Sequence, residues 1–303
     1  MKRGSAVFFV SISALLWGST AAVAKLLLKN LDNLQILPAI CLFSAVFLFI
    51  MVVIRKKLHV IAGYRFKDYI YFAWMGFLGV FLYTFLLYKA LSLMPAQEAF
   101  IINYLWPVMV VIFSAIVLKE KFTPRKIAGM AVSFLGIFIV ISKGDLTGLK
   151  FDSPAGILSA VSGAVCYGLF SALEKKHGYE KISSIMFYYF FSFIYSLAAV
   201  LWFSEFPSLG LKQLAGLAWL GAFVNGLSTV CWFLALKYGD TARISNIILV
   251  TPFMSLIYIQ VLLGERVLLP SITGLFVIVA GIIVQNLKPG DSSRGDSSRG
   301  DES

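Results

Sequence analysis

Apolar residues in this chain form continuous runs of about 20 residues, the length at which a helix crosses a hydrocarbon layer about 30 Å thick. Ten such runs follow one another, separated by short polar segments. Their approximate boundaries are Ser5–Leu28, Gln35–Ile54, Asp68–Leu91, Gln97–Leu118, Arg125–Ile141, Ser153–Leu173, Ile182–Ser204, Gln213–Leu236, Ala242–Leu263 and Pro270–Leu287. Because apolar residues are continuous rather than alternating, helices are predicted and not barrel strands. The pattern predicts an all-α integral membrane protein with ten transmembrane helices.

The sequence repeats itself at an interval of 145 positions, without a gap. Thirteen residues of the first half recur as the same type in the second half: Ala90, Leu91, Ile102, Pro107, Met109, Ile112, Leu118, Glu120, Ile127, Gly129, Val132, Gly136 and Ile137. A tandem repeat of membrane spans is a common construction of secondary transporters.

Five spans in each half force the second half to cross the membrane in the opposite sense. Glu120, after the fourth span, and its partner Glu265, after the ninth, are therefore expected on opposite sides. The predicted units are a first five-helix repeat over 1–145, an inverted repeat over 153–288, and a disordered polar tail over 289–303. Such inverted repeats surround a central substrate site near the midplane.

Composition and charge agree with a membrane location. Hydrophobic residues make up 59% of the chain and charged residues 14%, against about 25% charged in soluble domains. The net charge is +11, but 19 of the 26 Lys and Arg residues fall in one set of alternate loops. By the positive-inside rule, both termini are predicted in the cytoplasm. The basic charge thus indicates lipid as a partner and not nucleic acid.

The ordered features of both halves resemble the drug/metabolite transporter superfamily, and within it the EamA-type exporters, which include amino-acid exporters of the YddG type. The features are Trp17-Gly18 in the first span, Ala90-Leu91 and Ala235-Leu236 before short turns, Pro107 and Pro252 within the fourth and ninth spans, and Glu120 and Glu265 at their ends. The resemblance implies a basket of helices around a central cavity, lined mainly by the first, third, fourth, sixth, eighth and ninth spans. It leaves open whether the substrate is an amino acid, sugar, nucleotide sugar or drug.

Polar and aromatic side chains within the spans are the candidate substrate contacts. Two groups are defined by helical spacing: Asn103 with Trp106, and the stripe Asn225, Ser228, Thr229 and Trp232. The alternative for both groups is helix packing through small polar residues. Trp17, Tyr83 and Tyr167 are weaker candidates, since aromatic residues near span ends are often interface anchors.

Pro107 and Pro252 are the predicted hinges. A proline removes a backbone donor and frees the carbonyl four residues earlier, which is tolerated at membrane depth where it lines a cavity or packs on neighbours. A static kink is the alternative.

Three charged residues near span ends are candidates for a charge or coupling role: Glu98, Lys89 and Glu174. Glu98 opens the fourth span, where an acid complements the helix dipole, and it could instead pair with Lys89 or a substrate amine. No span has an acid or histidine at its centre, so a buried proton relay is not visible in the sequence.

Neither a phosphate-binding loop nor a cluster of metal-ligating residues is present, so no cofactor, metal or catalytic residue is expected. The predicted function is a secondary transporter of the inner membrane that exports a small metabolite, most simply an amino acid, by alternating access. The alternatives are export of a sugar, nucleotide or drug-like compound, and a membrane enzyme or scaffold. A monomer is expected, with a dimer as the alternative.

Overall fold

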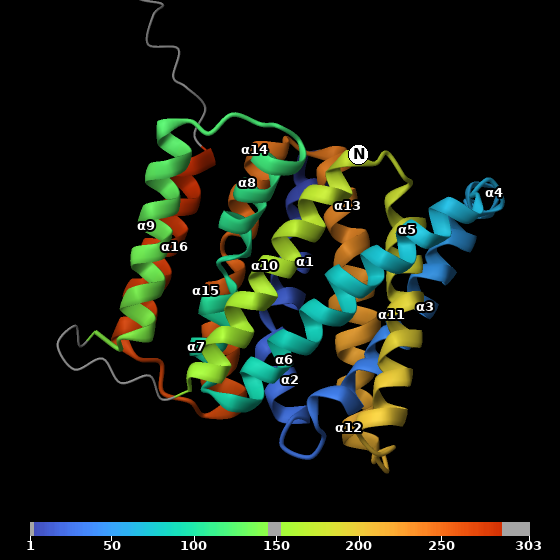
Figure 1. The fold of residues 1–303 in the computed structure, drawn as a ribbon, viewed down its shortest axis with the longest axis horizontal. Helices are drawn as coiled ribbons and strands as arrows, with labels where there is room; N and C mark the ends of the chain where they lie inside the picture. Colours follow the sequence, from blue (N-terminus) through green and yellow to red (C-terminus); the bar gives the residue numbers. More distant parts are fainter. Residues whose placement is uncertain (1–2, 145–152, 287–303) are drawn as a thin grey trace, which may run out of the picture.

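The computed structural model describes residues 3–144 and 153–286, and this part of the chain is a bundle of helices without strands (Figure 1). The helices of the first half are α1 (Arg3–Gly18), α2 (Thr20–Leu27), α3 (Asn33–Ile54), α4 (Leu58–Ala62), α5 (Phe66–Gly76), η1 (Phe77–Leu82), α6 (Tyr83–Leu93), α7 (Ala96–Asn103), α8 (Trp106–Val117) and α9 (Pro124–Ile141). Those of the second half are α10 (Pro154–Lys176), α11 (Lys181–Phe203), α12 (Leu211–Ala218), η2 (Trp219–Leu227), α13 (Ser228–Tyr238), α14 (Thr241–Ile248), α15 (Thr251–Tyr258), η3 (Ile259–Leu263) and α16 (Leu269–Asn286). The segments η1, η2 and η3 are π-helical.

Nine segments of the described residues are long and apolar enough to cross a membrane, which confirms an all-helical membrane protein. They are Ser5–Leu27, Asn33–Ile54, Phe66–Leu93, Ala96–Val117, Pro124–Ile141, Pro154–Lys176, Lys181–Phe203, Leu211–Tyr238 and Asn246–Leu263. The tenth predicted span coincides with Leu269–Gln285, a shorter apolar helix, so the count of ten stays a prediction. The predicted tail, 289–303, and residues 145–152 between the halves lie outside the described residues.

Two of the spans are broken at corresponding places. The fourth span divides between α7 and α8 in a turn at Tyr104 and Leu105, and the ninth divides between α14 and α15 in a turn at Leu249 and Val250. In both, a proline follows within two or three residues of the turn. Proline cannot donate to the carbonyl four residues earlier and its ring clashes with that carbonyl, so the helix is interrupted there.

The helices pair across the two halves of the chain. The α9 helix packs along α16 at the edge of the bundle, α3 packs on α11, α10 on α6 and α8, and α1 on α13 (Figure 1). Small residues permit the α9–α16 contact: a Cβ added at Gly136 would lie 2.6 Å from the carbonyl oxygen of Gly274. The Ser133 hydroxyl donates to the Ile278 carbonyl at 3.2 Å across the same contact. Close backbone approach through small residues is the usual basis of helix association in lipid.

Candidate functional site

Four of the predicted substrate contacts lie together at the break in the fourth span. Tyr83 comes from α6, Asn103 ends α7, Trp106 begins α8, and Tyr167 lies on α10. The Asn103 amide nitrogen donates to the Tyr83 hydroxyl at 3.2 Å. The ring of Tyr167 lies 4.7 Å from that of Tyr83 and 5.2 Å from that of Trp106, centroid to centroid. We call these four residues the Asn103 cluster.

At the break in the helix, the Asn103 side chain is buried but one of its two polar atoms is not hydrogen-bonded within the described residues. Asn103 is 2% exposed, and its Oδ1 atom has no hydrogen-bond partner among the described residues. An unsatisfied buried acceptor costs about 1–3 kcal/mol, so a donor that reached this oxygen would be bound favourably. Gly163 on α10 lies beside this oxygen, because an added Cβ would be in van der Waals contact with it at 3.4 Å. The Asn103 cluster can therefore accept one hydrogen bond from a donor bounded by aromatic faces.

A second aromatic pair joins α1 and α13. The rings of Trp17 and Trp232 lie 5.9 Å apart at 53°, so these two predicted contacts also meet. Two hydroxyl groups of the predicted stripe in the eighth span are already hydrogen-bonded within their own helix. The Ser228 hydroxyl donates to the Val224 carbonyl, and the Thr229 hydroxyl donates to the Asn225 carbonyl at 2.6 Å.

Those bonds favour the packing alternative for Ser228 in particular. Ser228 is fully buried, and its own carbonyl accepts the Ser13 hydroxyl of α1 at 2.9 Å. Asn225 lies in the π-helical segment η2 and is half-buried. The residues of the stripe thus divide, with Trp232 facing an aromatic partner and Ser228 joining two helices.

The second break, at Pro252, has buried hydroxyl groups that sequence reasoning missed. Thr251 and Ser255 lie on one face of α15, are at most 5% exposed, and have hydroxyl oxygens without a partner in the described residues. Both border α1, because a Cβ at Gly18 would lie 3.4 Å from the Thr251 carbonyl oxygen and the Ser255 nitrogen. Serine and threonine are frequent in membrane helices, so composition alone gave no reason to select these two.

The three charged candidates are dispersed. Glu98 lies in the first turn of α7 and forms an ion pair with Lys143 at 3.5 Å. Glu174 forms an ion pair with Lys181, and Lys89 is exposed. None of the three lies in the Asn103 cluster. In the described residues no group of three or more His, Cys, Asp or Glu side chains could hold a metal ion.

Outside the spans, Tyr179 joins the loop before α11 to the start of α5. Its hydroxyl donates to Asp68 Oδ1 at 2.7 Å. Removal from water and this hydrogen bond raise the pKa of Tyr179 to about 12. Burial and the nearby charge of Glu180 likewise raise the pKa of Tyr64 to about 12. Both phenols are therefore neutral at physiological pH; Tyr179 donates a hydrogen bond and Tyr64 packs against neighbouring aromatic rings.

Comparison with known proteins now identifies the family. The sequence profile described as the EamA-like transporter family matches residues 4–142 and again residues 154–287. The chain belongs to the EamA-like transporter family. The resemblance to drug/metabolite transporters is thereby confirmed.

Three relatives of this EamA-like transporter are named as transporters or exporters. It is 24% identical to an uncharacterized transporter of Clostridium kluyveri over the whole of both chains. It is 26% identical to the aromatic amino acid exporter YddG of Ancylobacter novellus, over 61% of this chain and 65% of that exporter. An uncharacterized transporter of Archaeoglobus fulgidus is 23% identical over 92% of this chain and 96% of its own length.

A solved crystal structure of a protein shares the fold, with a TM-score of 0.66 and 20% identity, covering 94% of this chain and 97% of that chain. The EamA-like transporter is thus a multi-pass membrane protein and not an enzyme. The alternative of a membrane enzyme or scaffold is set aside by the family.

Proposed function

We propose that this chain exports amino acids, and that the Asn103 cluster receives them. The observation that carries the proposal is the buried Asn103 Oδ1 atom, which lacks a partner among the described residues and belongs to a side chain bonded to Tyr83, whose ring stands in a row with those of Tyr167 and Trp106. An amino acid offers an ammonium group as the missing donor and an apolar side chain for the aromatic faces. The similarity to a protein named as an aromatic amino acid exporter supports the same substrate class.

The ammonium group gains a second interaction in such a site. A cation near the face of an aromatic ring is attracted by the ring quadrupole, by about 2 kcal/mol when desolvated. The cluster itself supplies no carboxylate, so recognition would rest on neutral acceptors and rings. That arrangement lets a substrate leave as well as bind, since no buried ion pair has to be broken.

We further propose that residues 1–145 and 153–288 are inverted repeats of five helices, giving ten spans. Packing supports the correspondence of the halves. A Cβ added at Gly18 would meet Met254, and one added at Gly168 would meet Met109, which lies 145 positions before Met254. The two glycines follow Trp17 and Tyr167 in the first spans of their halves. Equivalent contacts thus recur with the two halves exchanged.

The α9–α16 contact supports the same correspondence. A Cβ added at Gly136 would meet the carbonyl of Gly274, and one at Gly129 would meet that of Gly281. Positions 129 and 274, and likewise 136 and 281, are 145 apart. The contact between α9 and α16 is therefore equivalent when read from either helix, as it must be at a two-fold axis.

Alternating access would follow from such halves, each rocking against the other around a site near the midplane. Pro107 and Pro252, which interrupt the fourth and ninth spans, are the proposed hinges. The distribution of Lys and Arg supports an orientation in the inner (plasma) membrane with both termini in the cytoplasm.

The experiment is counterflow in liposomes that contain the purified protein. Vesicles are preloaded with unlabelled amino acids, and the entry of labelled amino acids is followed. We expect accelerated entry for aromatic or large apolar amino acids, and a loss of roughly tenfold or more for Asn103→Ala because a hydrogen bond to a charged group is lost. Asn30→Ala, at an exposed asparagine after α2, is the matched control.

The two outcomes that contradict the proposal differ in what they exclude. Full counterflow in Asn103→Ala would remove the Asn103 cluster from the substrate path while keeping the amino-acid substrate. Absence of counterflow for every amino acid, from folded protein, would exclude the substrate class. The same vesicles would then be tested with sugars, nucleotides and cationic drugs, the remaining solute classes.

A further inference from the structure

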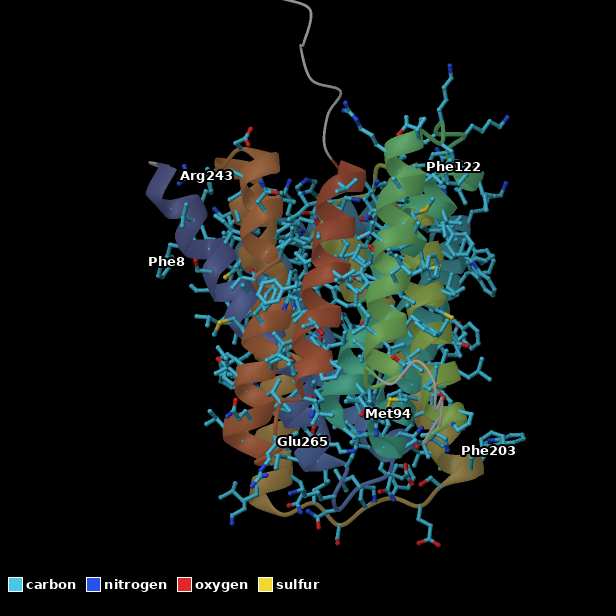
Figure 2. The ribbon with its side chains drawn as sticks, turned by 90° about the vertical axis from the view of Figure 1, so that its left-hand side faces the viewer. Phe8, Met94, Phe122, Phe203, Arg243 and Glu265 are labelled. Atoms are coloured by element: carbon cyan, nitrogen blue, oxygen red, sulfur yellow. The ribbon has the colours of Figure 1, made fainter. Side chains whose placement is uncertain are left out.

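The two ends of the helix bundle are not equally closed. Met94 and Glu265 lie at one end, which we call the Glu265 end, while Arg243 and Phe122 lie at the opposite end, the Arg243 end (Figure 2). The α7 helix begins at the Glu265 end, and all of its residues are buried. The α14 helix begins at the Arg243 end, and its residues Arg243 and Asn246 are exposed. Since α14 lies 145 positions after α7, the two half-helices are equivalent in sequence, yet α7 is buried throughout whereas α14 has exposed residues beside the buried Ile244.

The first turn of α7 depends on the other half of the chain for its hydrogen bonds. Pro95 occupies the N-cap position and offers no side-chain acceptor to the turn. The Ala96 N–H instead donates to Glu265 Oε1 at 3.1 Å. A carboxylate at a helix N-terminus satisfies an unpaired donor and complements the helix dipole. The cap that most helices obtain from a neighbouring residue is here supplied from 169 positions away.

Gln97 adds two hydrogen bonds to the same segment. Its side-chain nitrogen donates to the Arg266 carbonyl at 2.9 Å, and its side-chain oxygen accepts the Leu268 N–H at 3.0 Å. The amide of one buried glutamine therefore binds both a donor and an acceptor of the segment between η3 and α16. We call the three hydrogen bonds made by Ala96 and Gln97 to residues 265–268 the α7 latch.

Lys25 closes the adjoining turn. Its ammonium donates to the carbonyls of Leu91 and Met94, the latter at 2.8 Å, where α6 ends and the turn to α7 begins. Its positive charge also interacts with Glu265. Lys25 thus connects α2 to the same end of the bundle that the α7 latch closes, and sequence reasoning had no sign of this because the partners are backbone carbonyls.

At the Arg243 end, the described residues at the corresponding positions make different contacts. Position 242, which corresponds to Gln97, is alanine, and α14 is capped locally, by Asp240 Oδ1 accepting the Arg243 N–H at 2.9 Å. Glu120, which corresponds to Glu265, is exposed and pairs with Lys126 at 3.1 Å. The described capping bond of α14 therefore lies within its own half of the chain.

We infer that the α7 latch is a gate that holds the Glu265 end closed, and that the sequence biases this transporter toward that conformation. Opening the Glu265 end breaks three hydrogen bonds between the halves, whereas the described bond from the Arg243 N–H to Asp240 and the Glu120–Lys126 ion pair each lie within one half. This inference rests on the proposed alternating-access function, in which each end opens in turn.

The test measures distances at both ends with pairs of spin labels, in protein whose three native cysteines are replaced. One pair, at Ser92 and Leu269, reports on the Glu265 end, and the other, at Phe122 and Arg243, reports on the Arg243 end; all four positions are exposed. In Gln97→Ala we expect the ratio of open to closed protein at the Glu265 end to rise roughly tenfold, since two hydrogen bonds are lost. The second pair should show the opposite change, because the two ends alternate.

The reciprocal change separates a gate from a merely structural contact, which would loosen the Glu265 end alone. Gln260→Ala, at an exposed glutamine in η3, is the matched control and should leave both distances unchanged. If the wild-type open population is too small to detect, the double variant Gln97→Ala, Glu265→Ala removes all three bonds and must reveal it.

Two results would overturn the inference. One is an unchanged Ser92–Leu269 distance in both Gln97→Ala and the double variant. The other is a longer Ser92–Leu269 distance without any change at the Arg243 end. The distances are measured without substrate. If the distances shift reciprocally but the protein transports no amino acid, the gate is supported and the amino-acid substrate is excluded. If transport is normal but the distances do not change, the substrate is supported and the gate is excluded.

Discussion

Replacing Gly136 by alanine should destabilise the protein by forcing α9 and α16 apart. An added Cβ would lie 2.6 Å from the Gly274 carbonyl oxygen, 2.7 Å from Ile278 Cγ1 and 2.8 Å from the Ile278 nitrogen. Two of these three atoms belong to the backbone of α16, so the clash cannot be relieved by rotating a flexible side chain. The helices must separate, and the Ser133 hydrogen bond to Ile278 would lengthen with them.

Two effects of opposite sign decide the magnitude. Overpacking a well-packed contact costs about 1–3 kcal/mol, whereas alanine in place of glycine within a helix gains up to about 1 kcal/mol in propensity. The clash should therefore dominate, with a net loss of about 1–2 kcal/mol and a melting temperature lower by roughly 2–8 °C. Gly274→Ala should lose a similar amount, and the double variant should be non-additive because the two positions touch.

Thermal unfolding in detergent can be followed with a dye that fluoresces on reaction with thiols. Cys41 and Cys231 are buried and Cys166 is half-buried, so reaction reports the loss of helix packing. Gly178→Ala is the matched control, since a Cβ at this loop glycine meets nothing within 4 Å. Equal melting temperatures for Gly136→Ala and Gly178→Ala would show that the close α9–α16 approach contributes nothing to stability and would refute the reasoning.

Three further outcomes are expected. Pro107→Ala restores a backbone donor that can pair with the Asn103 carbonyl, so counterflow should slow several-fold while the melting temperature stays the same or rises; unchanged counterflow would mean a static kink. Trp232→Ala should impair counterflow without loss of folding if this ring contacts substrate, and normal rates would leave it a packing role with Trp17. Because the pKa of Tyr179 is raised from 10.0 to about 12, the stability contributed by its neutral phenol is complete below pH 10 and lost as pH rises through about 12. Melting temperatures across that interval should fall less steeply for Tyr179→Phe than for wild type, and parallel curves would contradict the assignment.

The helical fold was predictable because the spans are defined by one strong signal. Continuous apolar runs mark helices that must satisfy their own backbone in lipid, and the observed boundaries differ from the predicted ones by a few residues. The breaks after Asn103 and Ile248 were also predictable, since proline follows each. The π-helical segments were not, because an extra residue in a helical turn is imposed by packing and has no compositional signature.

The candidate site was predictable in part. Asn103 and Trp106 share a helical spacing, but their approach to Tyr83 and Tyr167 depends on how α6 and α10 pack on the fourth span. Substrate contact by the stripe of the eighth span stays a prediction; its sequence pattern did not show that the Thr229 hydroxyl bonds to the carbonyl four residues earlier, as helical serine and threonine often do. The α7 latch could not be foreseen, since the side chain of Gln97 bonds to backbone groups 169 and 171 positions away.

The two halves have the same residue type at positions that shape the backbone and different residue types at the proposed substrate contacts. Pro107 and Pro252, which interrupt helices, recur as the same residue type, as do the glycines of the α9–α16 contact. In contrast, isoleucine stands 145 positions after Asn103 and serine stands 145 positions after Tyr83. If the halves are inverted repeats as proposed, the two equivalent positions therefore offer different side chains to the substrate. If the substrate is bound as proposed, Asn103 of the first half recognises its polar end, and the second half contributes Tyr167 of α10 and Trp232 of α13. Ile248→Asn should then leave the selectivity measured by counterflow unchanged, because Asn103 still recognises the polar end of the substrate. Asn103→Ile should abolish that selectivity.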